Sequence, residues 1–322
     1  MAHELTKNQS GQYEMMYVGQ KPWHGLGQKL DKPATAEEAI TAANLNWTVS
    51  QREIITADGI DLPNHRAIVR DDNKDVFGVM TQWYQPIQNA EAFGFFDSVV
   101  GTGQAIYETA GSIFGGRRIF LTAKLPGEIR ATKDDVTQKY LTLINGHDGS
   151  LALRMYYTPV RVVCNNTLNA SLRDANSSDS IAIYHRGNVE KRIKDAQDAL
   201  GLAHRYYDEF QNIVDRLVAK QVGAKMVDDM LAEIFQTEGK DPKHSTAFEN
   251  AEKTKNMFEN DPKQQLAGIK GTMWAFYNAV AQYADHEATV VKGAADKRFN
   301  AIVSGTSAGT KQKAMKLCLK SL

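Results

Sequence analysis

Residues 107–125 read Y-E-T-A-G-S-I-F-G-G-R-R-I-F-L-T-A-K-L, and residues 140–169 read Y-L-T-L-I-N-G-H-D-G-S-L-A-L-R-M-Y-Y-T-P-V-R-V-V-C-N-N-T-L-N. These two runs hold the densest strand and turn signals in the chain. From Arg118 to Leu125 apolar side chains occupy every second position, which predicts a strand with one face towards a core. The run N-G-H-D-G-S at 145–150 predicts a turn between two further strands.

The positive charges of this region are more notable than its hydrophobic pattern. The whole chain of 322 residues carries 38 Lys and Arg against 38 Asp and Glu, so its formal net charge is zero. Between Gly101 and Arg173, however, nine Lys or Arg face five acids, and between His286 and Leu322 seven face two. An anion-binding site is therefore expected to be local, because no whole-protein basic field exists.

Composition limits the class of protein. Hydrophobic residues make up 42% and charged residues 24%, which is typical of a globular chain of roughly two domains. The two cysteines, Cys164 and Cys318, are far apart, which predicts no disulfide framework and favours a reducing cytoplasm. We find no secretory signal and no apolar run of the ~18 residues that a membrane span needs, so a cytoplasmic location without a membrane partner is expected.

The first half predicts alternating helices and strands. A helix is expected from Thr35, with two glutamates in its first turn, and another from Asn89. Between them, short strand signals separated by turns from residue 47 to 80 predict an antiparallel meander. Residues 1–35 contain no regular pattern.

Thr158 and Pro159 predict a further helix, with Thr158 as its N-cap and Pro159 at the first helical position. One edge of this helix would carry polar side chains at a spacing of four: Arg161, Asn165, Asn169 and Arg173. Two interpretations stay open for this edge, a polar binding partner or a hydrogen-bonded structural seam.

From residue 188 the pattern changes to long amphipathic helices, predicted at 188–222, 226–235 and from 261 onwards. The fold class is therefore α+β: an antiparallel β-meander sheet with packed helices, followed by a mostly α-helical C-terminal half. The domain prediction is an α+β core domain at residues 1–187, the candidate nucleic-acid-binding part, and a helical domain at 188–322 with a flexible basic C-terminal tail.

Common catalytic and cofactor motifs are not found. No phosphate-binding glycine loop, nucleophile elbow or metal-ligand spacing is present, so we expect no cofactor, no metal and no catalytic residue. His147, Asp148 and Ser150 resemble a catalytic triad only superficially, because side chains of neighbours in a tight turn diverge. Cations with interleaved aromatics instead suit a single-stranded nucleic acid.

The chain resembles phage/plasmid-like proteins that carry a conserved domain of unknown function. The matching motifs are Trp23-His-Gly-Leu-Gly27, Tyr84-Gln-Pro-Ile-Gln-Asn-Ala-Glu-Ala-Phe93, Glu108-Thr-Ala-Gly-Ser112, Gly115-Gly-Arg-Arg118, Ala123-Lys-Leu-Pro126, Asn145-Gly-His-Asp-Gly-Ser150 and Thr158-Pro-Val-Arg-Val-Val-Cys-Asn-Asn-Thr-Leu-Asn169. This resemblance implies a mobile-element origin. A more distant similarity, in element order and placement of basic residues, is to Erf-type and Redβ-type single-strand annealing proteins, which form rings or filaments on DNA.

The resulting hypothesis is a non-enzymatic single-stranded DNA-binding and annealing protein of phage or plasmid recombination. Its predicted DNA-binding residues are Arg117, Arg118, Lys124, Arg154, Tyr156, Tyr157, Arg161, Asn165, Asn169 and Arg173. The cations would hold phosphates, the asparagines would donate to phosphate or sugar oxygens, and the tyrosines would support bases.

The predicted partners are single-stranded DNA, further copies of the chain in a ring or filament, and phage or host recombination or replication proteins. The basic tail at 311–320 would add a second contact. Two alternatives stay open: an enzyme on nucleic acid or nucleotides that uses His147 and Asp148, and a mobile-element adaptor that binds a host protein.

Overall fold

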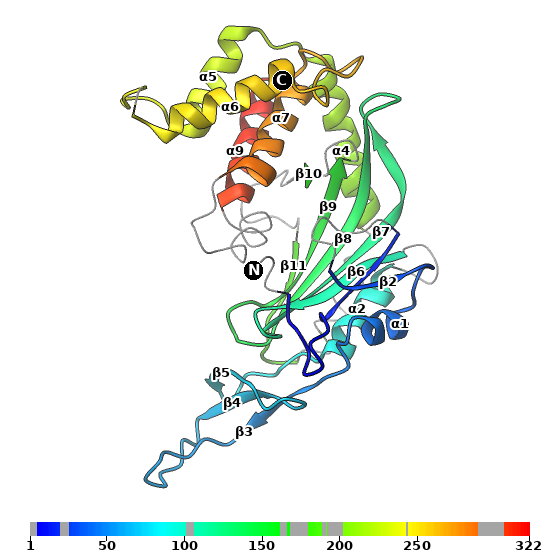
Figure 1. Ribbon diagram of the computed structural model, residues 1–322, viewed down its shortest axis with the longest axis vertical. Helices are drawn as coiled ribbons and strands as arrows, with labels where there is room; N and C mark the ends of the chain where they lie inside the picture. The colour runs from blue at the N-terminus through cyan, green and yellow to red at the C-terminus, as the bar shows by residue number, and fades with distance from the viewer. Residues whose placement is uncertain are drawn as a thin grey trace. The chain divides into compact units, whose positions relative to one another are not determined.

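A computed structural model (Figure 1) describes these parts of the chain: residues 5–19, 26–100, 106–161, 166–167, 180–188, 191, 202–242, 244–288 and 306–322. Two compact units interleave along the chain. The first unit comprises Met1–Pro126, Tyr140–Tyr157 and Ser180–Gly201, and the second comprises Gly127–Lys139, Thr158–Asp179 and Leu202–Leu322. The units do not follow a single cut after residue 187, because three long strands contribute to both. That the helical part forms a domain of its own stays a prediction.

The large sheet is mixed in direction. Its strands are β1 (Met15–Val18), β2 (Gln28–Leu30), β6 (Ile106–Ile113), β7 (Arg118–Arg130), β8 (Val136–Gly146), β9 (Leu153–Arg161), β10 (Asn166–Thr167) and β11 (Ser180–Ile183). The order is β10-β9-β8-β7-β6-β1-β2, and β11 also pairs with β9. β1 runs antiparallel to β6 but parallel to β2, so the prediction of a purely antiparallel meander needs correction. The α+β class with a helical C-terminal half is confirmed.

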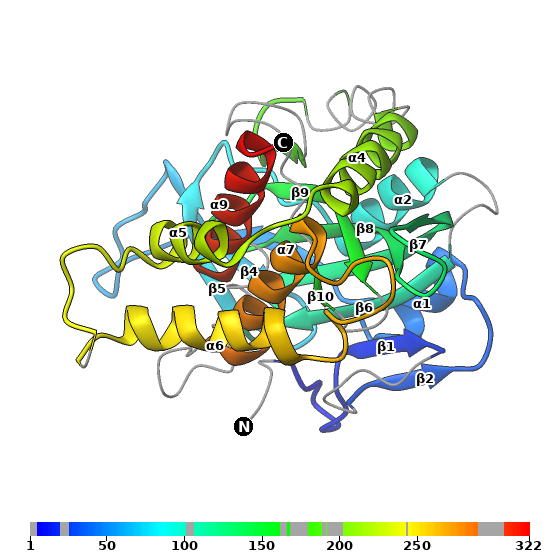
Figure 2. The same ribbon diagram turned by 90° about the horizontal axis from the view of Figure 1, so that it is seen from above.

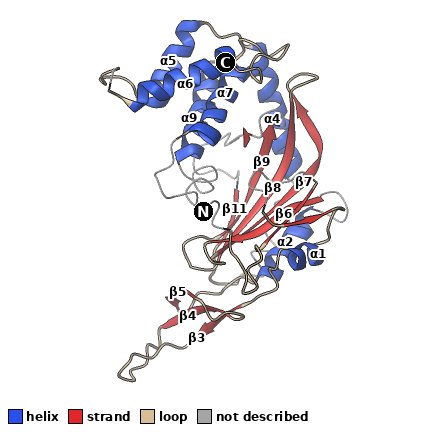
Figure 3. Cartoon of the chain, in the orientation of Figure 1, coloured by secondary structure: helices blue, strands red, loops and turns tan. Residues whose placement is uncertain are grey.

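A small antiparallel sheet forms where the meander between residues 47 and 80 was predicted. It contains β3 (Val49–Arg52), β4 (His65–Arg70) and β5 (Val76–Thr81), shown together in Figure 3. The free edge of β3 is covered at Val49 by the Gln88 side chain, which accepts from Val49 N at 3.0 Å and donates to Val49 O at 2.9 Å. An edge strand protected in this way is less open to pairing with another chain.

Two helices complete the core of the first unit. α1 (Ala36–Ala42) starts at Thr35, as predicted, and the structure adds a capping box between Thr35 and Glu38. α2 (Asn89–Val100) supplies Phe93, Phe95 and Phe96 to a core that also takes the inward faces of both sheets. In β7 the core side contains Ile119, Leu121 and Ala123, so the alternation predicted for this strand is confirmed.

The helix predicted from Thr158 is wrong over the residues that the structure describes. Thr158–Arg161 is the end of β9, and Asn166–Thr167 forms β10, which pairs with it. The run is rich in β-branched residues, and neighbouring strands supply partners for its backbone. A good helix N-cap signal was therefore overridden by tertiary pairing.

The described helices of the second unit are α4 (Leu202–Ala219), α5 (Ala224–Phe235), α6 (Thr246–Asn260), α7 (Met273–Gln282), the π-helical turn η1 (Tyr283–Glu287) and α9 (Thr306–Lys320). α7 contacts α4, α6 and α9 (Figure 2), and all of its residues are buried. α5 matches its prediction. α6 was not predicted, and the helix expected from residue 261 starts only at Met273, where Thr272 provides the N-cap.

The C-terminal segment is also a correction, because residues 306–320 form a helix in place of the expected flexible tail. Lys311 is 1% exposed, and its ammonium donates to Asp285 Oδ1 at 2.7 Å. Lys313 Nζ donates to the Ile234 carbonyl at the end of α5, at 3.5 Å. Burial and these internal contacts occupy two of the cations on which a second DNA contact would depend.

Candidate functional site

The loop at 145–150 is the point in the first unit where several elements meet. Asn145 donates to the carbonyl of Ile87 at 3.0 Å, and the backbone N–H of His147 donates to the carbonyl of Arg117 at 2.8 Å. The Tyr84 hydroxyl donates to the Gly146 carbonyl at 3.2 Å. The loop is thus fixed between the β6–β7 turn and the segment that precedes α2.

His147 is fully buried and packs among the elements that hold the loop. Its Nε2 lies 2.9 Å from Asn89 Oδ1, and its ring centroid lies 5.3 Å from that of Trp47. Burial, with smaller contributions from His185 and Arg70, lowers the pKa of His147 to about 3, so the ring is neutral near pH 7. The imidazole is thus buried and uncharged in this position.

Asp148 does not complete a triad with His147. Its Oδ1 instead accepts from the backbone N–H of Ser150 at 3.0 Å and from the Ser150 hydroxyl at 2.6 Å. The carboxylate therefore caps its own turn. His147 bonds to Asn89, whereas Asp148 bonds to Ser150, so the three side chains do not form one hydrogen-bonded triad. This arrangement weakens the case for an enzyme that uses them.

Two arginines flank the exposed side of the loop. Arg117 is exposed in the turn before β7, and Arg118 is half-buried at the first position of that strand. The Arg118 guanidinium donates to Ser150 Oγ at 3.1 Å and lies 5.1 Å from the centroid of the Phe114 ring. These contacts orient Arg118 along the loop, with Arg117 directly beside it in the chain.

Arg154 stands on the same side of the large sheet as Arg118. Its neighbours Leu153 and Met155 point into the core, so alternation places Arg154 on the opposite face, across from Ala182 of β11. Arg154 is half-buried, and its Nε is buried with no hydrogen-bond partner in the described part of the chain. Because Nε itself is buried, only the exposed remainder of the half-buried Arg154 side chain could contact an external anion.

Lys124 shares this face but lies further along β7. Burial raises the pKa of Glu108, and the positive charge of Lys124 lowers it by a smaller amount, so the pKa of Glu108 is raised overall. The face is not an open groove over this length, because Phe120, Tyr140 and Ile144 are all buried. The prediction that all the basic residues line one open groove is therefore not supported, and the accessible part is the loop end.

The other predicted residues do not join this loop. Tyr157 packs against the hydrophobic core on the opposite face of β9. Tyr156 lies in β9 across from Ser180, and Arg161 ends the same strand, paired with Asn166 in place of the predicted helix position. Asn165, Asn169 and Arg173 lie outside the described residues.

Ion pairing separates the cations of the candidate site from others in the chain. Arg70 is paired with Glu14 and Asp72, Arg52 with Asp71, and Lys311 with Asp285. Within the described ranges, neither Arg117 nor Arg154 forms an ion pair with a carboxylate. These two positive charges are available to an external anion.

Trp83, Tyr184 and Arg186 were not identified from the sequence as candidate site residues. Trp83 is 72% exposed and Tyr184 is 52% exposed, and Arg186 is also exposed. The only signals were local: an aromatic pair shortly after β5 and a Tyr-His-Arg run directly after β11. Exposure of single side chains cannot be deduced from such a run.

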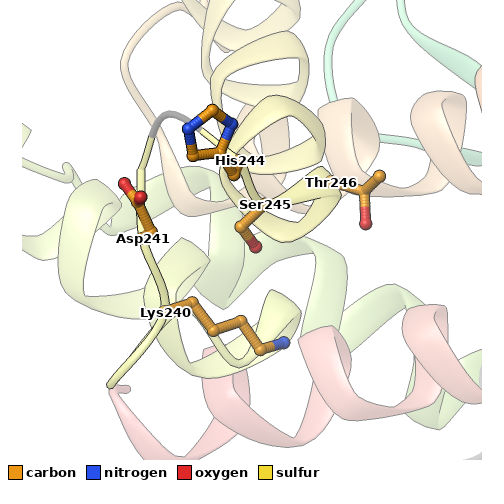
Figure 4. A pocket seen from close by; sticks show the side chains of 5 residues that line it. All are labelled: Lys240, Asp241, His244, Ser245 and Thr246. Carbon is orange, nitrogen blue, oxygen red and sulfur yellow. The ribbon is translucent and has the colours of Figure 1, made fainter.

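A depression in the second unit is a poorer candidate. It is lined by Lys240, Asp241, His244, Ser245 and Thr246, around the start of α6. Figure 4 shows that the Lys240 and Thr246 side chains point away from Asp241 and His244, so the five do not converge on one position. Ser245 is used as the N-cap of α6, where its hydroxyl accepts from Ala247 N at 3.2 Å. This surface offers no catalytic arrangement.

The described residues contain no cluster of three or more His, Cys, Asp or Glu that could hold a metal ion. Among the same residues, no helix combines the length and apolar character that crossing a bilayer requires. Cys318 is buried and free.

The mixed α+β fold and its basic loop are compatible with many functions, so comparison with known families is needed. A family model described as a domain of unknown function (DUF932) matches residues 76–314, from the start of β5 into α9. The chain therefore belongs to this family, and the matched range includes the loop at 145–150 and the cations around it. No curated protein and no solved structure matches the chain.

Proposed function

We propose that the first unit binds single-stranded DNA through its phosphates at the loop 145–150 and its flanking cations. The observation that supports this most is the unpaired state of Arg117 and Arg154 within the described residues, beside the oriented guanidinium of Arg118. Phosphate contacts give affinity without base specificity. Lys124 would add a weaker contribution, since Glu108 lies within its electrostatic reach.

The finer proposal is strand annealing in phage or plasmid recombination. A protein that holds the backbone and leaves base edges accessible brings a bound strand into contact with its complement. The supporting arguments are the resemblance to phage/plasmid-like proteins and the distant similarity to annealing proteins. We further propose a homo-oligomer, as a ring or filament, that acts in the cytoplasm with phage or host recombination or replication proteins.

Binding of a fluorescein-labelled oligonucleotide, followed by anisotropy at 50 and 200 mM salt, tests the proposal. Three phosphate contacts give a slope of about −2 for log affinity against log salt, or about a 20-fold loss over this range. R117A/R154A should reduce the magnitude of this slope by about 1.4, because two phosphate contacts are removed. Lys225→Ala is the matched control, since Lys225 is exposed and paired with Asp229 in the second unit.

Absence of binding at 50 mM salt, or an unchanged slope in the double variant, would contradict the proposal. Annealing is measured separately, from the rate at which two labelled complementary strands pair with and without the protein. If the protein binds DNA but does not accelerate pairing, the binding proposal stands and the annealing proposal falls. Copurification with a host protein in place of DNA binding would favour the adaptor alternative.

A further inference from the structure

Trp83 is the largest exposed apolar side chain of the described residues, at 72% exposure. The other described tryptophans are buried: Trp47 is 7% exposed and Trp274 is fully buried. A single exposed apolar residue is ordinary on a protein surface. Three further features distinguish Trp83 from that ordinary case: the hydrogen bonds that hold its backbone, a neighbouring exposed aromatic side chain, and the surrounding positive charge.

The segment that carries Trp83 is held rigidly. Tyr84 N donates to Thr81 O at 3.0 Å, and Gln85 N donates to His185 O at 2.8 Å. The Tyr84 ring stacks on His185 with centroids 5.0 Å apart and an interplanar angle of 8°. Tyr84 thus anchors the chain on the inside while Trp83 remains in solvent.

A second aromatic ring is carried by the adjacent segment. Tyr184 precedes His185, which is 6% exposed and whose Nδ1 lies 3.2 Å from Gln85 O. The backbone turns tightly here, because Arg186 N donates to Tyr184 O at 2.8 Å. The stacked Tyr84–His185 pair therefore fixes two neighbouring loop segments, each with one exposed aromatic side chain. Such pre-organisation reduces the entropy lost on binding.

The charge around the two aromatics is suited to a polyanion. Arg186 is exposed and forms no ion pair with a carboxylate in the described part of the chain. The loop 145–150, with Arg117 and Arg118 on its other side, is joined to this segment by the Tyr84–Gly146 hydrogen bond. A nearby acid, Asp148, is engaged by Ser150. Aromatic faces beside cations match the unstacked bases and phosphates of a single strand.

We propose that Trp83 and Tyr184 form a stacking platform for the unpaired bases of single-stranded DNA; this inference rests on the proposed function. Stacking uses the face of a base and leaves its pairing edge accessible, so it is compatible with annealing. Bases inside a duplex are already stacked and paired, so the platform discriminates against double-stranded DNA. A second copy of the chain is the other chemically reasonable occupant, and the experiment separates the two.

The experiment compares two labelled oligomers of equal length, an oligothymidine and its abasic counterpart, which has phosphates but no bases. The wild-type protein should bind the oligothymidine about 5- to 100-fold more tightly. W83A and Y184A should each lose most of this preference while their affinity for the abasic strand is unchanged. R117A/R154A should show the reverse, with weaker binding of both strands and a retained preference. W83F keeps an aromatic face and should retain most of the preference.

Val79→Ala is the matched control, because Val79 is a 56% exposed apolar residue of β5. It should leave both affinities unchanged, and circular dichroism checks that every variant is folded. Tryptophan fluorescence gives a second measure: oligothymidine should quench the wild-type emission, and W83F should lose this quenching.

Equal wild-type binding of the two strands, or an undiminished preference in W83A, overturns the stacking inference but leaves DNA binding in place. If the wild-type protein binds neither strand, the proposed function fails and the platform fails with it. If W83A changes only the oligomeric state in size-exclusion chromatography, the surface is a contact between copies, and the stacking inference is again overturned.

Discussion

Replacement of Arg70 by methionine is expected to destabilise the first unit strongly. The Arg70 side chain is 2% exposed and that of Glu14 is fully buried, and their Nη2–Oε1 distance is 2.5 Å. The guanidinium also pairs with Asp72 at 2.7 Å and lies 4.2 Å from the Trp47 ring centroid. R70M leaves the Glu14 carboxylate buried with only Ser112 as a described side-chain partner.

Loss of one partner from a buried ion pair costs about 3–5 kcal/mol, because the remaining charge is desolvated without compensation. The assay is urea unfolding followed by circular dichroism. The matched control is R52M, since Arg52 pairs with Asp71 at 3.2 Å but its side chain is 57% exposed, and loss of such a pair costs about 1 kcal/mol or less. In the double variant E14Q/R70M the buried charge is absent, so it should be more stable than the sum of the single losses implies.

The network also supports the candidate site. Gly116, directly before Arg117, has a φ of +90°, and a Cβ added there would lie 2.7 Å from Arg70 Nη1. R70M should therefore disturb the turn that presents Arg117 and weaken DNA binding as well. A loss of stability in R70M no larger than that in R52M would refute the reasoning.

Two further predictions concern buried ionisable groups. K311M should lower the free energy of unfolding of the second unit by about 3–5 kcal/mol, because Asp285, which is 3% exposed, would keep a buried charge without its partner. The double variant D285N/K311M should recover part of the lost stability. The exposed pair partner Lys225 provides the control, and a loss in K311M no larger than the loss in K225M contradicts the prediction. Stability should also fall between pH 6.5 and about 4, because burial lowers the pKa of His147 to about 3 and of His185 to about 4 in the folded state. In this range the unfolded chain binds more protons than the folded one, so stability falls by about 1.4 kcal/mol per pH unit for each histidine. Urea unfolding at pH 7.5, 6.0 and 5.0 gives the free energy of unfolding as a function of pH. Its dependence on pH should be weaker in H147Q than in the wild type, and an equal dependence would count against the prediction.

Local signals in the sequence determined much of the first unit. The helix start at Thr35 with its two first-turn glutamates, the turns between residues 47 and 80, and the alternation from Arg118 to Leu125 each act between residues close in the chain. The structure shows α1, the small sheet and β7 at these places. The concentration of basic residues around the loop 145–150 was also visible from composition alone.

Only the tertiary structure decided the direction of β1, the strand after Thr158 and the helix at the C-terminus. Each depends on a partner distant in the sequence: β1 lies between β2 and β6, the end of β9 pairs with β10, and Lys311 of α9 meets Asp285. The preference of different residue types for a strand spans only about 1 kcal/mol and depends on context. Burial of an apolar face or pairing of a strand edge exceeds this preference.

The same reason limits what the sequence determined about the site. It identified Arg117, Arg118 and Arg154 by charge, but could not tell them from Arg70, an arginine at the end of β4. The difference lies in the acids brought near by folding: Glu14 reaches Arg70 across 56 positions, whereas no described carboxylate pairs with Arg117 or Arg154. Charge is a property of the residue, but its availability to a ligand is a property of the fold.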